Sequence, residues 1–171
     1  GKSPSKLDDK KIIFLNQYYL KNLPKNKVFK IFLDYLEKRN VELLNNTKKN
    51  LLIYFSDFLK RSITIKDLYE NLKFTLSDQK LSVKTEHKLL LEDKKIYKDE
   101  IISKIESIGH WDEINIKKEF SDFIKEKKIS FKDIGLPIRI ILTNNLNSPS
   151  VYSIMIILGK KEVLNRLIKL W

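Results

Sequence analysis

Apolar residues recur at intervals of three and four along nearly the whole chain, which is the spacing of an amphipathic helix. Asp8 and Asp9 stand before the first such run, where two acids suit the positive end of a helix dipole. Pro24 ends this run and opens the next one. The apolar residues of the first three predicted helices are Ile12, Ile13, Leu15, Tyr19 and Leu20, then Val28, Phe32, Tyr35 and Leu36, then Leu51, Leu52, Phe55, Phe58 and Leu59.

Small hydrogen-bonding residues stand where further helices would begin. Their side chains can accept a backbone N–H of the first turn, which has no partner inside the helix. The expected caps are Thr64 with Asp67 three residues on, Asp112, Ser130 with Asp133 three residues on, and Ser148 with Pro149 in the first turn. Gly109 and Gly159 are expected to end the helices before them.

Two stretches depart from this pattern. Residues 75–86 are polar and aperiodic, and we predict a linker there between two halves of the chain. Residues 138–143 are rich in β-branched side chains, which would permit a buried strand. A lone strand would have no partner in this chain, so we predict a helix there too. The pattern as a whole predicts an all-α fold.

Composition supports helices and limits the chemistry. Among 171 residues there are four glycines and four prolines, too few for the many tight turns of an all-β fold. The chain has no cysteine, which excludes disulfides and cysteine-based zinc sites and is compatible with a reducing compartment. No apolar run approaches the ~20 residues of a membrane helix. The first residues, Gly1 to Pro4, lack the apolar core of a signal peptide, so we expect neither a membrane nor an export segment.

The formal net charge is +12, from 34 Lys and Arg against 22 Asp and Glu. Such a surplus attracts phosphates or anionic lipids. A bias toward Lys, Asn and Ile without any partner would produce the same charge. Charge alone therefore leaves nucleic-acid binding open.

Catalytic constellations are missing from the pattern. The two histidines, His87 and His110, have no metal-ligand partner four residues away, and a solvated or structural role explains each of them. We find no phosphate-binding loop, nucleophile elbow or metal-binding helix motif. Any chemistry is expected to lie outside this chain.

Three features favour binding instead. Lys60 and Arg61 end an amphipathic helix, where they either complement its dipole or present a guanidinium to a base. Arg139 is the only charge between residues 135 and 143, so it must reach a carboxylate or an external ligand. The loop 143–149 is dense in Asn, Ser and Thr and is either an ordinary capped turn or a contact for an anion or a base edge.

Four segments, in order along the chain, resemble one family. They are KSPSKLDDKKIIFLNQYYLKN (2–22), FLKRSITI (58–65), Trp111 before a capped helix, and LPIRIILTNNLNSPSVYSIMIILGKKEVLNRL (136–167). Together they are similar to the part of bacterial glutamyl-tRNA synthetases that follows the catalytic domain. Each motif alone is moderately specific for this family, and the four motifs in this order are strongly specific for it.

This resemblance implies an all-helical cage in two subdomains, 1–77 and 78–171, that grips the anticodon stem and loop of tRNA(Glu). The full enzyme would be a monomeric, cytoplasmic class I ligase that attaches glutamate to tRNA with ATP and Mg²⁺. Those cofactors belong to a catalytic domain that this chain lacks, so the chain itself is expected to hold no cofactor or metal and to be inactive alone.

The resemblance also implies site residues. Arg61 matches the arginine that reads the third anticodon base, and its fork of donors suits a cytosine. Lys60 would give a supporting basic contact. The segment that packs on splayed anticodon bases matches Arg139, Thr143, Ser148, Pro149, Val151 and Tyr152. Tyr152 would stack on a base, and Ser148 would hydrogen-bond to one.

The chain departs from the family pattern at three places. Ser121 stands where some members carry an anticodon-contacting arginine, Val151 is smaller than the common leucine, and 76–86 aligns poorly, which softens the subdomain boundary. Two other functions stay open: a stand-alone basic helical module that binds RNA or an acidic partner without reading an anticodon, and a self-sufficient enzyme.

Overall fold

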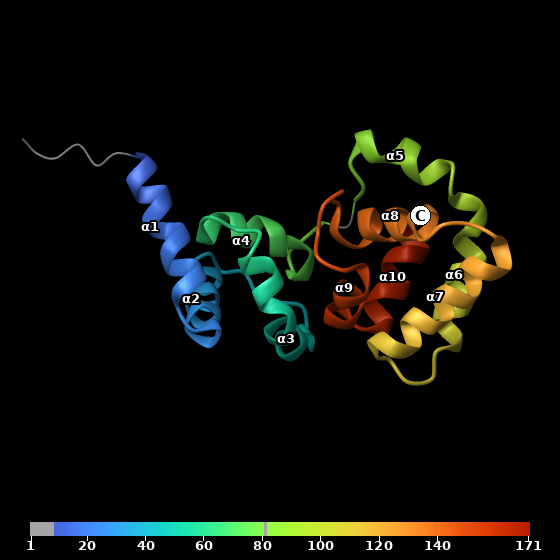
Figure 1. Cartoon of the computed structure of the whole chain (residues 1–171), viewed down its shortest axis with the longest axis horizontal. Coiled ribbons are helices and arrows are strands. Elements are labelled where there is room, and N and C mark those ends of the chain that lie inside the picture. The colour runs from blue at the N-terminus through green and yellow to red at the C-terminus, as the bar shows by residue number, and fades with distance from the viewer. Residues whose placement is uncertain (1–8, 81) are drawn as a thin grey trace, which may run out of the picture.

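The computed structural model describes residues 9–80 and 82–171, and the predicted all-α fold is confirmed within them (Figure 1). The described part contains ten α-helices and two short 3-10 helices. An isolated antiparallel bridge joins Leu43 and Leu76. The elements are α1 (Asp9–Asn22), α2 (Lys25–Glu37), α3 (Thr47–Leu59), α4 (Ile65–Leu72), η1 (Lys73–Thr75), α5 (Thr85–Glu92), η2 (Lys95–Tyr97), α6 (Lys98–Ser107), α7 (Glu113–Lys127), α8 (Phe131–Thr143), α9 (Val151–Leu158) and α10 (Lys160–Leu170).

The first half of the chain, from α1 to η1, builds its core from aromatic rings. Phe55 of α3 packs edge-on against Phe29 of α2, with ring centroids 4.9 Å apart. The apolar faces of α2 and α3 are buried as their spacing predicts. In α1, by contrast, Ile13 and Tyr19 are 46% and 55% exposed. Asp8 and the side chains of Ile12 and Leu15 lie outside the described residues.

The second half, from α5 to α10, is organised around α8. This helix packs against α5, α7, α9 and α10, and residues 138–143 lie inside it as predicted. Ile138, Ile140, Ile141 and Leu142 are all buried. Because α8 is covered on most sides, its apolar residues do not follow a simple one-face pattern, which is why this segment resembles a strand in the sequence.

The predicted caps are confirmed except for one. Asp67 N donates to Thr64 Oγ1 at 3.1 Å, and Asn115 N donates to Asp112 Oδ1 at 2.8 Å. At the start of α8, the Asp133 carboxylate accepts a hydrogen bond from Ser130 N at 2.9 Å. The prediction for Ser148 was wrong.

The cap of α9 is Ser150, whose Oγ accepts from Tyr152 N at 3.2 Å. Pro149 precedes this cap and is outside the first turn. Two serines flank the proline, and the spacing of the apolar residues does not distinguish them.

The predicted linker, residues 75–86, was too long at both ends. Thr75 belongs to η1 and is buried, while α5 already begins at Thr85. Thr75 O accepts from Leu44 N at 2.8 Å, and Glu42 O accepts from Ser77 N at 2.9 Å. The start of this segment is thus tied to residues more than thirty positions earlier, contacts that local polarity does not indicate.

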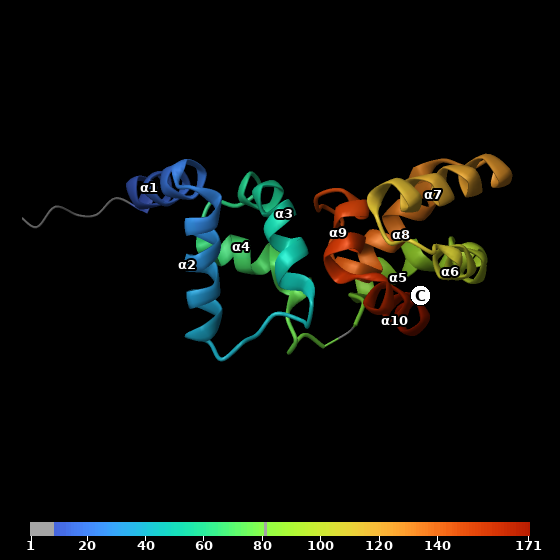
Figure 2. The same ribbon diagram turned by 90° about the horizontal axis from the view of Figure 1, so that it is seen from below.

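The two halves meet where α3 lies beside α9, and both views show this junction (Figures 1 and 2). Asn50 Nδ2 of α3 donates to Ile156 O of α9 at 2.9 Å. Tyr54 OH donates to Glu113 Oε2 of α7 at 3.3 Å. Polar contacts therefore accompany the packing of α3 on α9 where the two halves meet.

Candidate nucleic-acid interface

A pocket of about 420 Å³ lies where the ends of α3 and α4 meet the loop between α8 and α9. It brings Arg61 together with Thr143, Ser148 and Pro149, four of the residues that the sequence singled out. The full lining is Phe58, Arg61, Asn71, Thr143, Asn145, Asn147, Ser148 and Pro149. One guanidinium, three amides and two hydroxyls thus share the lining, which contains no carboxylate.

The backbone around Arg61 is held by the end of α3. Arg61 N donates to Phe58 O at 3.1 Å, and the buried Ser62 Oγ donates to the same carbonyl at 2.9 Å. Asn71 of α4 donates to Ser62 Oγ at 3.0 Å and to Arg61 O at 3.5 Å. The backbone is therefore anchored, while the residue itself is exposed and its guanidinium is available to a ligand.

Arg139 adjoins the pocket one turn before the end of α8. Its Nη1 donates to Leu146 O at 3.4 Å, and its Nε is buried without a hydrogen-bond partner. Burial, followed by the positive charge of Arg61, lowers the pKa of the Arg139 guanidinium. The carboxylate partner that the sequence allowed as one alternative is not found among the described residues, so this arginine keeps an unmet need for an acceptor.

Thr143 shapes the loop and uses its hydroxyl internally. Its Oγ1 donates to Arg139 O at 2.8 Å and accepts from Asn145 N at 3.2 Å. The next residue, Asn144, turns the chain with a φ of 56°, and its Oδ1 accepts from Lys84 N at 3.0 Å. These bonds end α8 and direct residues 145–148 toward Arg61.

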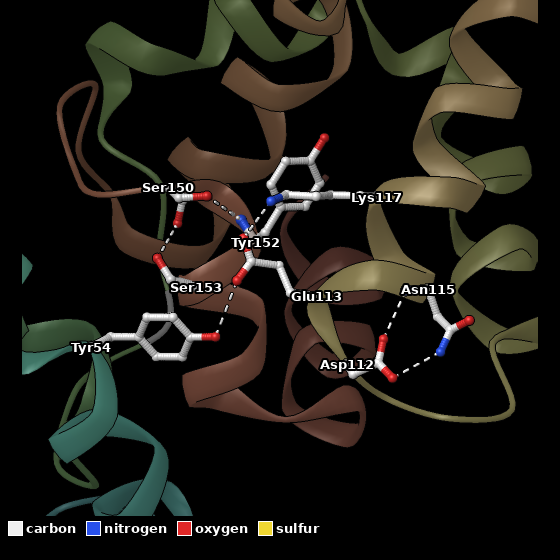
Figure 3. A network of polar contacts seen from close by, with 8 residues as sticks. All are labelled: Tyr54, Asp112, Glu113, Asn115, Lys117, Ser150, Tyr152 and Ser153. Atoms are coloured by element: carbon white, nitrogen blue, oxygen red, sulfur yellow. Dashed lines mark hydrogen bonds and ion pairs between the residues drawn. The ribbon is translucent and has the colours of Figure 1, made fainter.

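Val151 and Tyr152 lie apart from the pocket lining. Val151 is buried, and the Tyr152 ring contacts Phe131 at a centroid distance of 5.4 Å and Phe120 at 6.0 Å. Lys117 places its ammonium 5.4 Å from the Tyr152 ring centroid. Figure 3 shows Lys117 between this ring and Glu113, which also contacts Tyr54. Burial raises the pKa of the Tyr152 phenol.

Lys60 also points elsewhere. Its side chain is 77% exposed and forms an ion pair with Asp57 at 3.5 Å. It borders a separate groove beside Leu20 and Leu59. A dipole-complementing charge at the end of α3 accounts for its position.

Sequence reasoning missed Asn71 as a pocket residue and treated Phe58 only as core. Asn71 is a polar residue at the end of a short helix, and nothing in the local pattern indicates that its side chain reaches back ten residues to Arg61 O. The fold, and not the spacing, brings these groups together.

Positive charge is concentrated in the first half. Residues 9–77 carry 14 Lys and Arg against 7 Asp and Glu, a net +7, and residues 78–171 carry 18 against 14, a net +4. In the described second half several lysines pair with acids, as in Lys94–Asp133, Lys104–Glu126 and Lys127–Glu100. In the described first half the ion pairs are Lys60–Asp57 and Lys73–Glu70. The first half, which contains Arg61, therefore has the stronger attraction for phosphates.

Residues 9–80 and 82–171 contain no group of three or more His, Asp or Glu side chains placed to hold a metal ion. His87 is buried, and His110 lies 3.4 Å from Asp112. Within the same residues, no helix has the length and apolarity needed to cross a membrane.

The family model described as "Anticodon binding domain" matches residues 27–170. Among curated proteins, the chain is 35% identical over 173 residues to a glutamate–tRNA ligase of Pelagibacter ubique and 32% identical over 170 residues to one of Buchnera aphidicola. These matches cover 98% of this chain but only 36% and 35% of the relatives. The chain thus spans about a third of the length of the curated relatives it matches.

Solved structures give the same fold. A glutamate tRNA ligase from Elizabethkingia meningosepticum superposes with a TM-score of 0.80 at 22% identity, covering 98% of this chain and 33% of that one. A glutamate–tRNA synthetase from Elizabethkingia anophelis gives 0.75 at 23% identity, covering 98% and 32%. The order of helices described above is therefore found within longer proteins.

Proposed function

The chain belongs to the family of anticodon binding domains, and from this premise we propose that it recognises the anticodon of tRNA(Glu) as part of a glutamate–tRNA ligase. The names of the curated relatives support the choice of ligase. The share of those relatives that it covers supports a role as one part of a longer protein. In this proposal translation is the process served, and the cytoplasm is its site.

One observation carries the proposal: the exposed Arg61 lines a pocket that lacks a carboxylate, and the Nε of Arg139, whose Nη1 reaches Leu146 O in the adjoining loop, is buried without a partner. Both side chains therefore present donors that an acceptor-rich ligand could satisfy. Such an arrangement is typical of sites where a ligand supplies the missing acceptors.

An unpaired RNA base meets these requirements. RNA loops are read by splaying bases out and hydrogen-bonding their edges. The Arg61 fork can donate to the acceptors of a cytosine, and the amides of Asn71, Asn145 and Asn147 can both donate and accept. In this role Arg139 neutralises the adjoining phosphate or base oxygen, and Ser148 and Pro149 contact the base from the loop side.

The remaining predicted residues take supporting parts. Thr143 fixes the loop through its hydroxyl bonds, and the buried Val151 anchors the start of α9. Lys60 adds long-range attraction for phosphates. Tyr152 already contacts Phe131 and Lys117, so a base would stack on it only where its ring stays uncovered.

We further propose two subdomains, 1–77 and 78–171, in a ligase that acts as a monomer. ATP and Mg²⁺ would bind to the part of the ligase that this chain does not include, and glutamate would be activated there. This chain would contribute recognition and no catalytic group.

Titration of the chain with a tRNA(Glu) anticodon stem-loop at two salt concentrations tests the proposal. A second stem-loop has the third anticodon cytosine replaced. The variant Arg61→Ala is compared with Lys132→Ala, which removes a charge at the start of α8, the end that lies away from the pocket residue Thr143. Replacing the cytosine should weaken binding by about 1–3 kcal/mol, and Arg61→Ala should remove that difference. Lys132→Ala should preserve it.

The second candidate is a basic module that grips phosphates without reading bases, which the +7 charge of residues 9–77 favours. Equal and strongly salt-dependent binding of both stem-loops would support it and remove the role given to Arg61. ATP–pyrophosphate exchange by the chain alone would contradict the assignment of catalysis to another part of the protein.

A further inference from the structure

Arg166 of α10 is the most deeply buried charge among the described residues, with 2% of its surface exposed. Its Nε donates to Glu162 Oε1 at 2.7 Å, Nη1 to Leu142 O at 2.6 Å and Nη2 to Phe74 O at 2.8 Å. A buried guanidinium is tolerated only when its charge and its donors are met, and here one carboxylate and two carbonyls meet them.

Neither carbonyl lines the pocket, but each belongs to a residue that is next to, or packs against, a lining residue of a different wall. Leu142 immediately precedes Thr143, which lines the pocket from the second half. Phe74 follows the end of α4, three residues after Asn71, and its ring lies 5.9 Å from that of Phe58, another lining residue. One planar group thus bonds to the backbone behind both walls.

This geometry is specific to arginine. A guanidinium presents donors in a rigid planar fork, so it can hold two carbonyls and a carboxylate at set positions. A lysine ammonium is a single point of charge on a flexible stem and cannot span the same three acceptors.

On the basis of the proposed function, we propose that Arg166 is a positioning residue for anticodon reading: it fixes the spacing between the Arg61–Asn71 wall and the Thr143–Ser148 wall. It does not contact the RNA itself. A binding site must hold its donors within about 0.5 Å of the productive geometry. We therefore expect the spacing of the walls to affect specificity more than overall affinity.

Other polar contacts between the halves serve as a comparison. Tyr54 OH donates to Glu113 Oε2, and neither residue lines the pocket. Tyr54→Phe removes an inter-half hydrogen bond and leaves both pocket walls untouched. If Arg166 only joined the two halves, Arg166→Lys and Tyr54→Phe would have the same effect on anticodon discrimination.

The first readout is the ratio of dissociation constants for the cytosine-substituted and the matched stem-loop. We expect a ratio of about 5 to 150 for the wild type, the range that corresponds to one base contact. Arg166→Lys should reduce this ratio at least fivefold while binding stays salt-dependent, and Tyr54→Phe should keep it. A folded Arg166→Lys protein with the wild-type ratio would overturn the proposal.

A second readout needs no RNA. The chain lacks cysteine, so spin labels can be attached at Lys66→Cys, on α4, and Leu146→Cys, in the loop. The distance distribution between them should broaden in Arg166→Lys and stay narrow in Tyr54→Phe; equal widths would contradict the proposal. If the wild type does not discriminate between the stem-loops, the proposed function fails, and the label distances still decide whether Arg166 spaces the walls.

If Arg166→Lys does not fold, Glu162→Gln takes its place. This change keeps the arginine but weakens its contact at Nε, and it should lower the ratio and broaden the distances partially. No change in either quantity would overturn the proposal.

Discussion

Arg61 and Arg139 lie close enough for one positive charge to disfavour the other, although they come from opposite halves of the chain. Arg61 is exposed, and the carboxylates that would offset it are absent from the described pocket lining. An exposed guanidinium without an offsetting carboxylate keeps its donors available to an acceptor-rich ligand.

The first prediction separates the effect of Arg61 on stability from its effect on binding. Arg61→Gln should leave the free energy of unfolding within about 0.5 kcal/mol of the wild type, as for other exposed positions, or raise it slightly. The same change should weaken binding of the matched stem-loop by about 1–3 kcal/mol. Urea unfolding and fluorescence titration measure the two quantities. A large loss of stability would show that Arg61 has a structural partner.

The second prediction concerns the two serines beside Pro149. Ser150→Ala removes the cap of α9 and should lower the free energy of unfolding by about 1 kcal/mol. Ser148→Ala, in the pocket, should change stability much less and weaken stem-loop binding instead. Parallel urea and binding titrations of both variants test this pattern, and an effect of Ser148→Ala on stability alone would contradict the site.

The third prediction concerns pH. The Asp133 carboxylate accepts from Lys94 Nζ at 2.8 Å, from Ser130 Oγ at 2.7 Å and from Ser130 N at 2.9 Å, and these donors hold its pKa well below the usual range. A carboxyl with a lowered folded-state pKa stabilises the fold fully above its unfolded pKa of about 3.9, and loses this effect as the pH falls.

The stability advantage of the wild type over Asp133→Asn should therefore be constant from pH 7 to pH 5 and shrink below about pH 4. Urea unfolding at pH 7, 5, 3 and 2 measures it. Asp57→Asn, at an exposed ion pair with Lys60, is the control and should show little difference at any pH. An advantage that grows on acidification would refute the assignment.

The fourth prediction uses two glycines. A Cβ at Gly135 would lie 2.5 Å from Phe131 Cε1, so the Phe131 ring, which packs against Tyr152, must shift. Gly135→Ala should cost about 1–3 kcal/mol from overpacking, reduced by up to about 1 kcal/mol from the better helix propensity of alanine. Phe131→Leu in the same chain should recover part of the loss.

Gly109→Ala is the matched control, because no heavy atom lies within 4 Å of a Cβ there and Gly109 does not have a positive φ. It should be neutral or stabilise by up to about 1 kcal/mol. Thermal unfolding compares the variants, and equal effects at both glycines would remove the steric argument.

Local signals in the sequence predicted the local structure. Thr64 with Asp67 and Ser130 with Asp133 act over three residues, so their spacing alone identifies a helix start. The burial of Thr75 could not be predicted in this way, because its carbonyl is bonded to Leu44 N, a residue distant in sequence.

The candidate site was predictable only in part. The resemblance placed Arg61, Arg139 and the 143–149 loop together, and the structure brings most of them to one pocket. Arg166 lies inside the resembling segment 136–167, but no role was predicted for it, because an arginine four residues after Glu162 has the spacing of an ordinary surface ion pair. Its burial depends on η1 and α8, whose carbonyls meet α10 only in the folded protein.

The bond from Arg166 to Phe74 O joins residues 92 positions apart. A ribosome adds roughly 5–20 residues each second, so α4 and η1 would exist for roughly 5–20 seconds before their buried partner is made. During that interval the Arg61–Asn71 wall has been synthesised, but Arg166 is not yet present to set its distance from the Thr143–Ser148 wall. Under the proposed function, the two walls would therefore reach their final spacing only after α10 has been made.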